Sequence, residues 1–113
     1  MREDMNYFSN VIGEKTHILQ LIKKLDLCLK LQMEQEVEYL SFKGGNVEPL
    51  NSNIHSQFQI TIRGNAEYLA QLFRGECKLR QGVRWGYFTI EDAPFRDLLL
   101  LESIFYLARP ISA

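Results

Sequence analysis

The chain holds few residues of the types that catalysis and metal binding use, and their spacing is not that of a reactive site. His17 and His55 lie far apart, and the sequence around them does not suggest a catalytic triad. Glu34, Glu36 and Glu38 alternate, so on a strand they would share one face, which is typical of a solvated surface. The sequence has no Gly-rich phosphate-binding motif. We therefore expect a protein that is not an enzyme.

The sequence around the two cysteines favours a structural role over a reactive or metal-binding one. Cys28 lies in the apolar run Leu27–Leu29, and we expect it to be a small buried hydrophobic residue. Cys77 lies between Glu76 and Lys78, and we expect it to be more exposed. Neither belongs to a CxxC motif or a Cys/His cluster, so the sequence predicts no metal site and no cofactor. A disulfide between the two cysteines stays open at this point.

The 113 residues have an ordinary globular composition, with 46% hydrophobic and 24% charged residues. Such a length is typical of one domain, which we place over residues 1–113. The net charge is −1, so no basic surplus favours nucleic acid. Acidic residues stand where a signal peptide would be basic, and no apolar run approaches the ~20 residues that cross a bilayer. We expect a cytoplasmic protein with no nucleic-acid partner and no stable membrane insertion.

Hydrophobic periodicity indicates which elements position the side chains of the first half. Apolar residues at steps of three and four predict a helix over about 6–26. Gly13 weakens its middle by roughly 1 kcal/mol relative to Ala, so a start after Gly13 stays open. The period then changes to two over 27–33 and again over 37–41, which favours a β-hairpin, although a continued helix stays open. Gly, Pro, Asn and Ser cluster over 44–53, which predicts a turn followed by a loop.

The second half predicts two strands and two helices that alternate. Asn65 follows a strand that stops at Gly64, and it is placed to cap the next helix, which Gly75 would end. The expected elements are a strand over 58–62, a helix over 66–73, a strand over 85–90 and a helix over 94–108. We therefore predict an α+β fold with an antiparallel-rich sheet of about five strands covered by helices.

The predicted closing helix is apolar on every face. Its four consecutive leucines, residues 98–101, span about 400° at 3.6 residues per turn, and a second apolar run follows over 104–107. A helix that is apolar all round is covered on more than one side. The cover can be the first helix of the same domain, a partner subunit or an apolar ligand, and the sequence leaves these three open.

Four segments in the second half follow one another in the order of a known pattern. They are a strand that ends in a polar turn (58–64), a short helix that ends in Phe-x-Gly (66–75), a strand (86–92) and a leucine-rich helix that begins at Phe95. In this order and spacing, the stretch from Phe58 to Leu107 resembles the sterol carrier protein-2 family of lipid-transfer proteins. The chain departs from the family at residues 91–94, which read Glu-Asp-Ala-Pro where members commonly have Gly-Asp.

The resemblance implies an apolar tunnel between sheet and helices, with no catalytic chemistry. A fatty acid, an acyl-CoA or a sterol-like lipid would be its ligand. The residues that we expect to line it are Leu69, Leu72, Phe73, Phe88, Phe95, Leu98, Leu99, Leu101 and Phe105. The alternative is a structural or interaction module without a ligand, a homodimer that forms through the closing helix with Leu100 and Ile104 in its interface.

A basic stretch over 74–84 precedes the last strand. It could form a mouth that binds lipid phosphate or another anion, because Arg suits bidentate phosphate contact. The alternative is a solvated loop that pairs with the acidic residues Glu34, Glu36, Glu38 and Glu48. Trp85 and Tyr87 would share one strand face beside it, where they could anchor a membrane, line a ligand mouth or be ordinary strand residues. The charged residues of this stretch are Arg74, Glu76, Lys78, Arg80 and Arg84.

Overall fold

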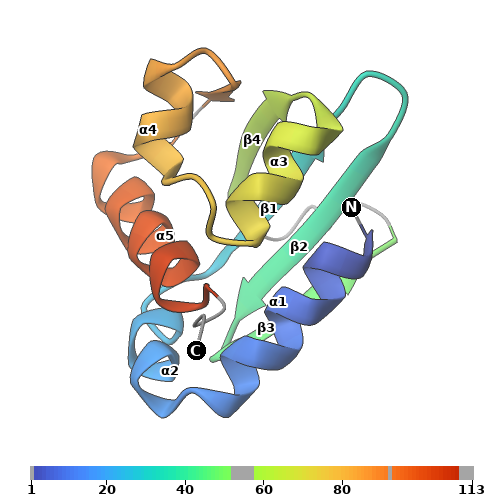
Figure 1. Ribbon diagram of the computed structural model, residues 1–113. Helices are drawn as coiled ribbons and strands as arrows, with labels where there is room; N and C mark the ends of the chain where they lie inside the picture. The colour runs from blue at the N-terminus through green and yellow to red at the C-terminus, as the bar shows by residue number, and fades with distance from the viewer. Residues whose placement is uncertain (1, 52–57, 92, 110–113) are drawn as a thin grey trace.

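A five-stranded sheet forms one layer of the molecule, and helices form the other (Figure 1). The computed structural model describes residues 2–51, 58–91 and 93–109. Within these ranges the elements in chain order are α1 (Arg2–Glu14), α2 (Thr16–Ile22), β1 (Leu27–Gln32), β2 (Val37–Lys43), β3 (Asn46–Leu50), β4 (Phe58–Gly64), α3 (Ala66–Phe73), α4 (Leu79–Arg84), β5 (Phe88–Glu91) and α5 (Phe95–Leu107).

The strand order is β3-β2-β1-β4-β5, and only the central pair, β1 and β4, is parallel. Leu29 on β1 lies opposite Leu40 on β2 and Ile60 on β4. Because side chains alternate along a strand, this register places the three on the same face, where all are fully buried. The predicted α+β class and five-stranded, mostly antiparallel sheet are confirmed.

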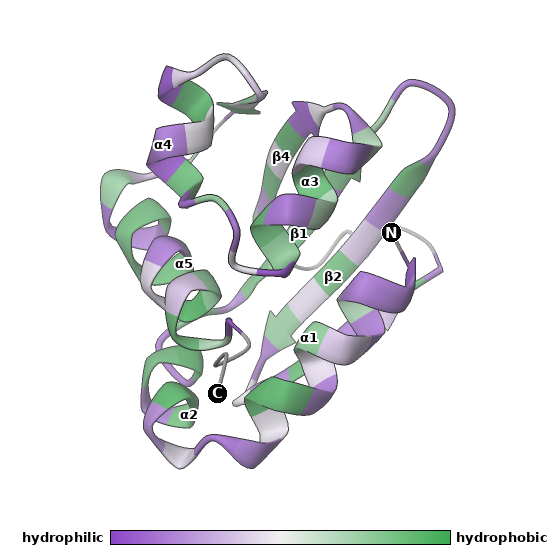
Figure 2. Cartoon of the chain, viewed as in Figure 1, coloured by the Kyte–Doolittle hydropathy of each residue, from purple (hydrophilic) through white to green (hydrophobic). Residues whose placement is uncertain are grey.

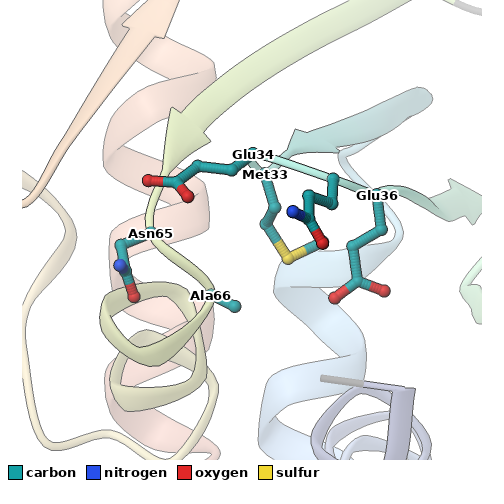
Figure 3. Close-up of a pocket in the computed structure, with 6 residues that line it drawn as sticks. Met33, Glu34, Glu36, Asn65 and Ala66 are labelled. Carbon is teal, nitrogen blue, oxygen red and sulfur yellow. The ribbon is translucent and has the colours of Figure 1, made fainter.

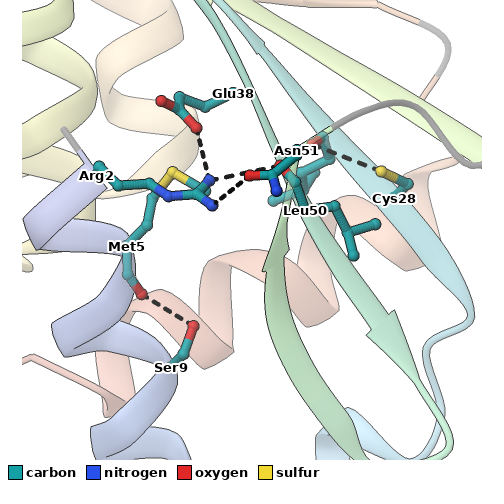
Figure 4. Close-up of polar contacts among 8 residues, drawn as sticks. Arg2, Met5, Ser9, Cys28, Glu38, Leu50 and Asn51 are labelled. Carbon is teal, nitrogen blue, oxygen red and sulfur yellow. Dashed lines mark hydrogen bonds and ion pairs between the residues drawn. The ribbon is translucent and has the colours of Figure 1, made fainter.

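The helices cover the apolar face of this sheet. In Figure 1, α1 and α3 cross in front of the strands, while α4, α5 and α2 lie along one side. Phe8 of α1, Phe73 of α3 and Phe105 of α5 meet in the interior, with ring centroids 4.9–5.2 Å apart. Arg2 ties the start of α1 to the sheet through Glu38 and the carbonyl oxygen of Leu50 (Figure 4). The core therefore lies between one sheet face and three helices.

The predicted helix over 6–26 is two helices. Lys15 adopts an extended conformation (φ −108°, ψ 99°) that interrupts the helical hydrogen bonds between α1 and α2. The apolar stripe continues across the break, since Phe8, Ile12, Ile18 and Ile22 are all buried. Periodicity alone therefore missed a break that one residue makes.

Two further expectations are wrong in part. The predicted loop contains β3, where Pro49 is tolerated because β3 is an edge strand. The end of the predicted loop, residues 52 and 53, lies outside the described residues, and so do His55 and Asp92. The predicted strand over 85–90 begins only at Phe88. The amide of Trp85 closes α4 by donating to Gln81, and the amide of Tyr87 donates to Gly82. Trp85 and Tyr87 therefore do not share a strand face.

Both cysteines are free thiols, so no disulfide joins them. Cys28 is fully buried, as predicted, but Cys77 is only 4% exposed, which contradicts the prediction of exposure. The loop between α3 and α4 turns this side chain into the core although both sequence neighbours are charged. Burial raises the pKa of the Cys77 thiol.

Candidate functional site

The closing helix α5 is covered on some sides and open on others. It packs between α2 and α4, and its residues Leu101, Ile104 and Phe105 are buried in the core. Leu98, Leu100 and Leu107 are half-buried, whereas Phe95 is 64% exposed. Figure 2 shows the hydrophobic colour along both α5 and α2. The helices of the described part therefore cover most of this apolar helix and leave its first turns open.

A groove runs along this open part. We call it the α5 groove; it has a volume of about 540 Å³, is open to solvent and has a mainly apolar lining. Arg96 and Lys24, the latter just after α2, are exposed at its margin, and no carboxylate is among the lining residues. The lining consists of Lys24, Phe95, Arg96, Leu99 and Leu100. This geometry suits a molecule with an apolar body and a negative group.

The structure divides the nine predicted lining residues into two groups. Phe95 and Leu99 line the α5 groove, and Leu98 is half-buried against the core beside them. The other six lie at most 2% exposed within the core: Leu69, Leu72, Phe73, Phe88, Leu101 and Phe105. Lys24, Arg96 and Leu100 lie outside the predicted set of ligand-lining residues. The sequence predicts Leu100 in a dimer interface, and no local signal places Lys24 beside α5.

The aromatic part of the core group is tightly packed. The ring of Phe105 stacks on Phe8 and meets Phe73 edge-on, so each ring fills space that the other two leave. Edge-to-face and offset pairs are the preferred geometries of aromatic rings. Phe73 and Phe105 thus contribute to the packing between α1, α3 and α5.

Two arginines of the basic stretch over 74–84 have acidic partners. Arg80 donates from its backbone amide and its guanidinium to Glu102 of α5 (3.1 and 2.9 Å), and Arg74 pairs with Glu76 and Glu67. The predicted pairing with acidic residues at 34, 36, 38 and 48 is therefore wrong for both. Burial raises the pKa of Glu102, but the hydrogen bonds and charge of Arg80 outweigh it, so the pKa lies below its ordinary value.

The surface beside this stretch, which includes the end of α5, presents cations and aromatic rings to solvent. The ammonium of Lys78 lies 5.2 Å from the ring centre of Tyr106, and the guanidinium of Arg109 lies 3.8 Å from it. Trp85 is 55% exposed and meets Tyr87 edge-on. A small depression of about 280 Å³ lies here, and its lining includes Glu102, whose carboxylate is bonded to Arg80.

Comparison with solved structures gives the fold of this chain. No family model and no curated protein matches the sequence. Among solved structures, a "UbiJ-SCP2 Ubiquinone synthesis protein" matches with a TM-score of 0.66 and 15% identity over 89% of this chain and 84% of that one. Apo sterol carrier protein 2 from Yarrowia lipolytica matches with a TM-score of 0.61 and 16% identity over 93% and 88%. The chain has the sterol carrier protein-2 fold.

The same fold is also found inside an enzyme. A stereoselective inverting sec-alkylsulfatase from Pseudomonas sp. matches with a TM-score of 0.62 and 16% identity over 83% of this chain, which covers 14% of the enzyme. The sterol carrier protein-2 fold can thus stand alone or form a small part of a much larger protein. Identities this low establish the fold alone.

A second pocket of this sterol carrier protein-2 fold lies at the β1–β2 turn. It has a volume of about 390 Å³ and a polar lining, in which Glu34 and Glu36 extend on either side of Met33 (Figure 3). The Asn65 side chain beside it already accepts the amide of Glu67 as the cap of α3. With two carboxylates and two amides beside Met33 and Ala66, this lining suits an apolar molecule less well than the α5 groove does.

The described residues contain no group of three or more His, Cys, Asp or Glu side chains arranged to hold a metal ion. Among the helices of the described part, none is both long enough and apolar enough to cross a membrane.

Proposed function

We propose that this protein binds an apolar small molecule of the lipid class, such as a fatty acid, an acyl-CoA or a sterol-like lipid, without changing it chemically. One observation carries the proposal: in a sterol carrier protein-2 fold, the apolar α5 retains an uncovered groove. Its volume of about 540 Å³ lies in the usual range of roughly 300–1,000 Å³ for small-molecule pockets.

The groove residues are the first candidates for ligand contact. Phe95, Leu99 and Leu100 offer apolar surface to a chain or ring. Leu98 is the next candidate, because it is half-buried where α5 meets the core. The six core members of the predicted set would contact a ligand only if the packing around them opened, since each is at most 2% exposed.

An energy estimate sets the size of ligand that the groove can hold alone. Burying one methylene contributes about 0.8 kcal/mol, so ten methylenes contribute about 8 kcal/mol. Association costs at least 4 kcal/mol in lost translational and rotational freedom, by the lowest current estimates. The difference of about 4 kcal/mol corresponds to a Kd near 1 mM. Useful affinity therefore requires a longer chain, polar contacts to Arg96 and Lys24, or partial opening of the core.

The first test is native mass spectrometry of protein purified without detergent, followed by organic extraction. A co-purified mass of lipid size at near-stoichiometric level would support the proposal and give the ligand class. An empty protein that also fails to take up an added fluorescent fatty acid would contradict it.

A pair of variants then locates the site. Leu99→Glu places a carboxylate in the groove, and we expect it to weaken uptake of the fluorescent fatty acid at least tenfold. Val83→Glu is the matched control, because Val83 is 39% exposed on α4 and does not line the groove. Equal uptake by both variants would place the ligand elsewhere.

The homodimer alternative uses the same face of α5. Leu100 lines the groove and is available to a second subunit, but Ile104 is fully buried inside the fold and cannot contact one. A stable interface buries about 1,200–2,000 Å² in total, which is far more than one groove. The native mass spectrum gives the subunit count together with the bound mass, and an empty dimer that Leu100→Glu dissociates would favour the interaction module.

A further inference from the structure

Positive charges without partners gather at the α5 groove. Arg96 and Lys24 are both exposed, and the side chain of neither makes a hydrogen bond or an ion pair with any residue that the structure describes. Arg2 and Arg63, by contrast, pair with carboxylates: Arg2 with Glu38, and Arg63 with Glu91. The chain as a whole has a net charge of −1. The positive character of the groove is therefore a local feature, and general attraction of the whole protein to anions does not explain it.

The groove also places a large apolar side chain directly beside this charge. Phe95 begins α5 and is 64% exposed, more than any other large apolar residue in the described part of the chain. Arg96 follows it in sequence, and Leu99 lies one turn later, so the three share the first turns of the helix. An exposed ring with adjacent cations and no acidic lining is typical of a surface that meets the boundary between lipid headgroups and acyl chains.

We propose that the α5 groove docks this protein on the surface of an anionic lipid bilayer. Phe95 enters the boundary between headgroups and acyl chains, and Arg96 and Lys24 contact lipid phosphates. Charge complementarity favours this occupant, because an anionic bilayer offers negative groups and apolar depth at one place. Figure 1 shows the β1–β2 turn, which carries Glu34 and Glu36, at a corner away from α5, so docking keeps this acidic end off the membrane.

The docking is peripheral and reversible. One Lys or Arg near an anionic surface strengthens binding about fivefold, so two of them contribute roughly 30-fold, and salt weakens this part. The proposal goes beyond ligand binding: it describes how the groove faces a bilayer, whether or not a free lipid also binds there.

The test is cosedimentation with vesicles of phosphatidylcholine, with and without phosphatidylglycerol, at low salt. We expect binding only to the anionic vesicles, and the double variant with Arg96→Glu and Lys24→Glu should reduce the partition coefficient at least 30-fold. Arg84→Glu is the matched control, because Arg84 is an exposed cation that pairs with no described carboxylate and lies outside the groove. It should change binding less than twofold. Equal losses in both variants would overturn the proposal.

Fluorescence locates the contact without relying on stability. Trp85 is the only tryptophan, and it does not line the groove. In the wild type its emission should not change when anionic vesicles are added. In a Trp85→Phe background, Phe95→Trp should shift to shorter wavelength and be quenched by brominated lipids. The opposite result, with a shift for Trp85 and none for the tryptophan at 95, would refute docking through the groove.

Other outcomes distinguish bilayer docking from an acidic protein partner and from the proposed ligand binding. Binding to immobilised poly-glutamate without binding to vesicles would indicate an acidic protein partner and would overturn the bilayer proposal. Uptake of an uncharged apolar probe in solution tests the proposed ligand function separately. If the double variant loses vesicle binding but still takes up the apolar probe, the result supports docking. If the wild type binds vesicles but takes up no apolar probe, docking is still supported and the ligand function is contradicted.

Discussion

Two glycines in helices offer a direct test of whether the core behind Phe88 is closed. Gly13 lies near the end of α1, where an added Cβ would meet no atom within 4 Å. Gly82 lies in α4, where an added Cβ would approach the ring of Phe88, with Cε1 at 2.6 Å and Cε2 at 2.9 Å. Real Cβ atoms do not lie this close to a ring, so Gly82→Ala requires that Phe88 move.

Phe88 has little room to move. It is 2% exposed, and its own Cβ faces Gly64 on the neighbouring strand, where an added Cβ would lie only 2.7 Å away. Replacing a helical glycine by alanine stabilises a helix by about 0.5–1 kcal/mol, and this is the expected gain for Gly13→Ala. Overpacking a core costs about 1–3 kcal/mol. The shift required at Phe88 is large, so we expect Gly82→Ala to lose about 1–2 kcal/mol net.

Urea unfolding followed by circular dichroism measures both variants in one assay. The free energy of unfolding should rise for Gly13→Ala and fall for Gly82→Ala. The melting temperatures should differ in the same directions, since 1 kcal/mol corresponds to about 4–8 °C in a domain of 60–100 residues. Adding Phe88→Leu to Gly82→Ala should recover part of the loss, because the leucine is shorter than the ring.

The opposite result has a clear meaning. If Phe88 lined an open tunnel, its ring could swing into the empty space and Gly82→Ala would stabilise the helix as Gly13→Ala does. Stabilisation by both alanines would therefore refute the closed packing described for Phe88, and it would return this residue to the candidates for direct ligand contact.

Three further predictions follow from the contacts. Phe105→Ala should destabilise the protein by about 3–5 kcal/mol in urea unfolding, because it removes a fully packed ring, whereas Phe95→Ala should change stability by less than about 0.5 kcal/mol. Because the folded pKa of Glu102 is lowered, its bond with Arg80 stabilises the protein above the unfolded pKa and is lost as pH falls through the folded value. The difference in urea midpoint between wild type and Arg80→Met should therefore be present at neutral pH and shrink in acid. Cys77 should react slowly with a thiol reagent in the native state and rapidly in denaturant, since burial both shields the thiol and raises its pKa.

The elements that the sequence predicted well are those whose signals are local. The alternation of Phe58, Ile60 and Ile62 marks β4. The next helix begins where the Asn65 side chain accepts a hydrogen bond from the backbone amide of Glu67 (2.8 Å). Both signals lie within a few residues of the element that they define, and neither depends on distant packing. The fold class followed from the order of such elements.

The elements that it missed depend on distant parts of the chain. Residues 46–50 contain Pro49, and Val47 is their only β-branched residue, yet they form β3 because β2 offers a free edge. The short α4 contains Gly82 and three polar or charged residues, and it is held by contacts with α5 such as the bond from Arg80 to Glu102. Partners so far apart in sequence leave no local pattern.

The candidate site was predictable to the extent that it belongs to α5. Phe95 and Leu99 were named from the leucine-rich helix, and both line the groove. Lys24 was not named, because only the packing of α2 against α5 brings it there. The six core members of the set have the same apolar character as the groove members, and the sequence could not tell which of them the other helices would cover.

The run of leucines over 98–101 posed the question of what covers a helix that is apolar on every side. The fold gives most of the answer, because Leu101 faces the core while α2 and α4 flank the helix. What is left is the surface around Phe95 and Leu99, together with two cations that no described residue neutralises. Packing can be satisfied without an exposed phenylalanine, so this surface is not needed for folding. Phe95→Ser should therefore leave stability almost unchanged while reducing binding to anionic vesicles, and a variant that loses both would show that the surface serves the fold.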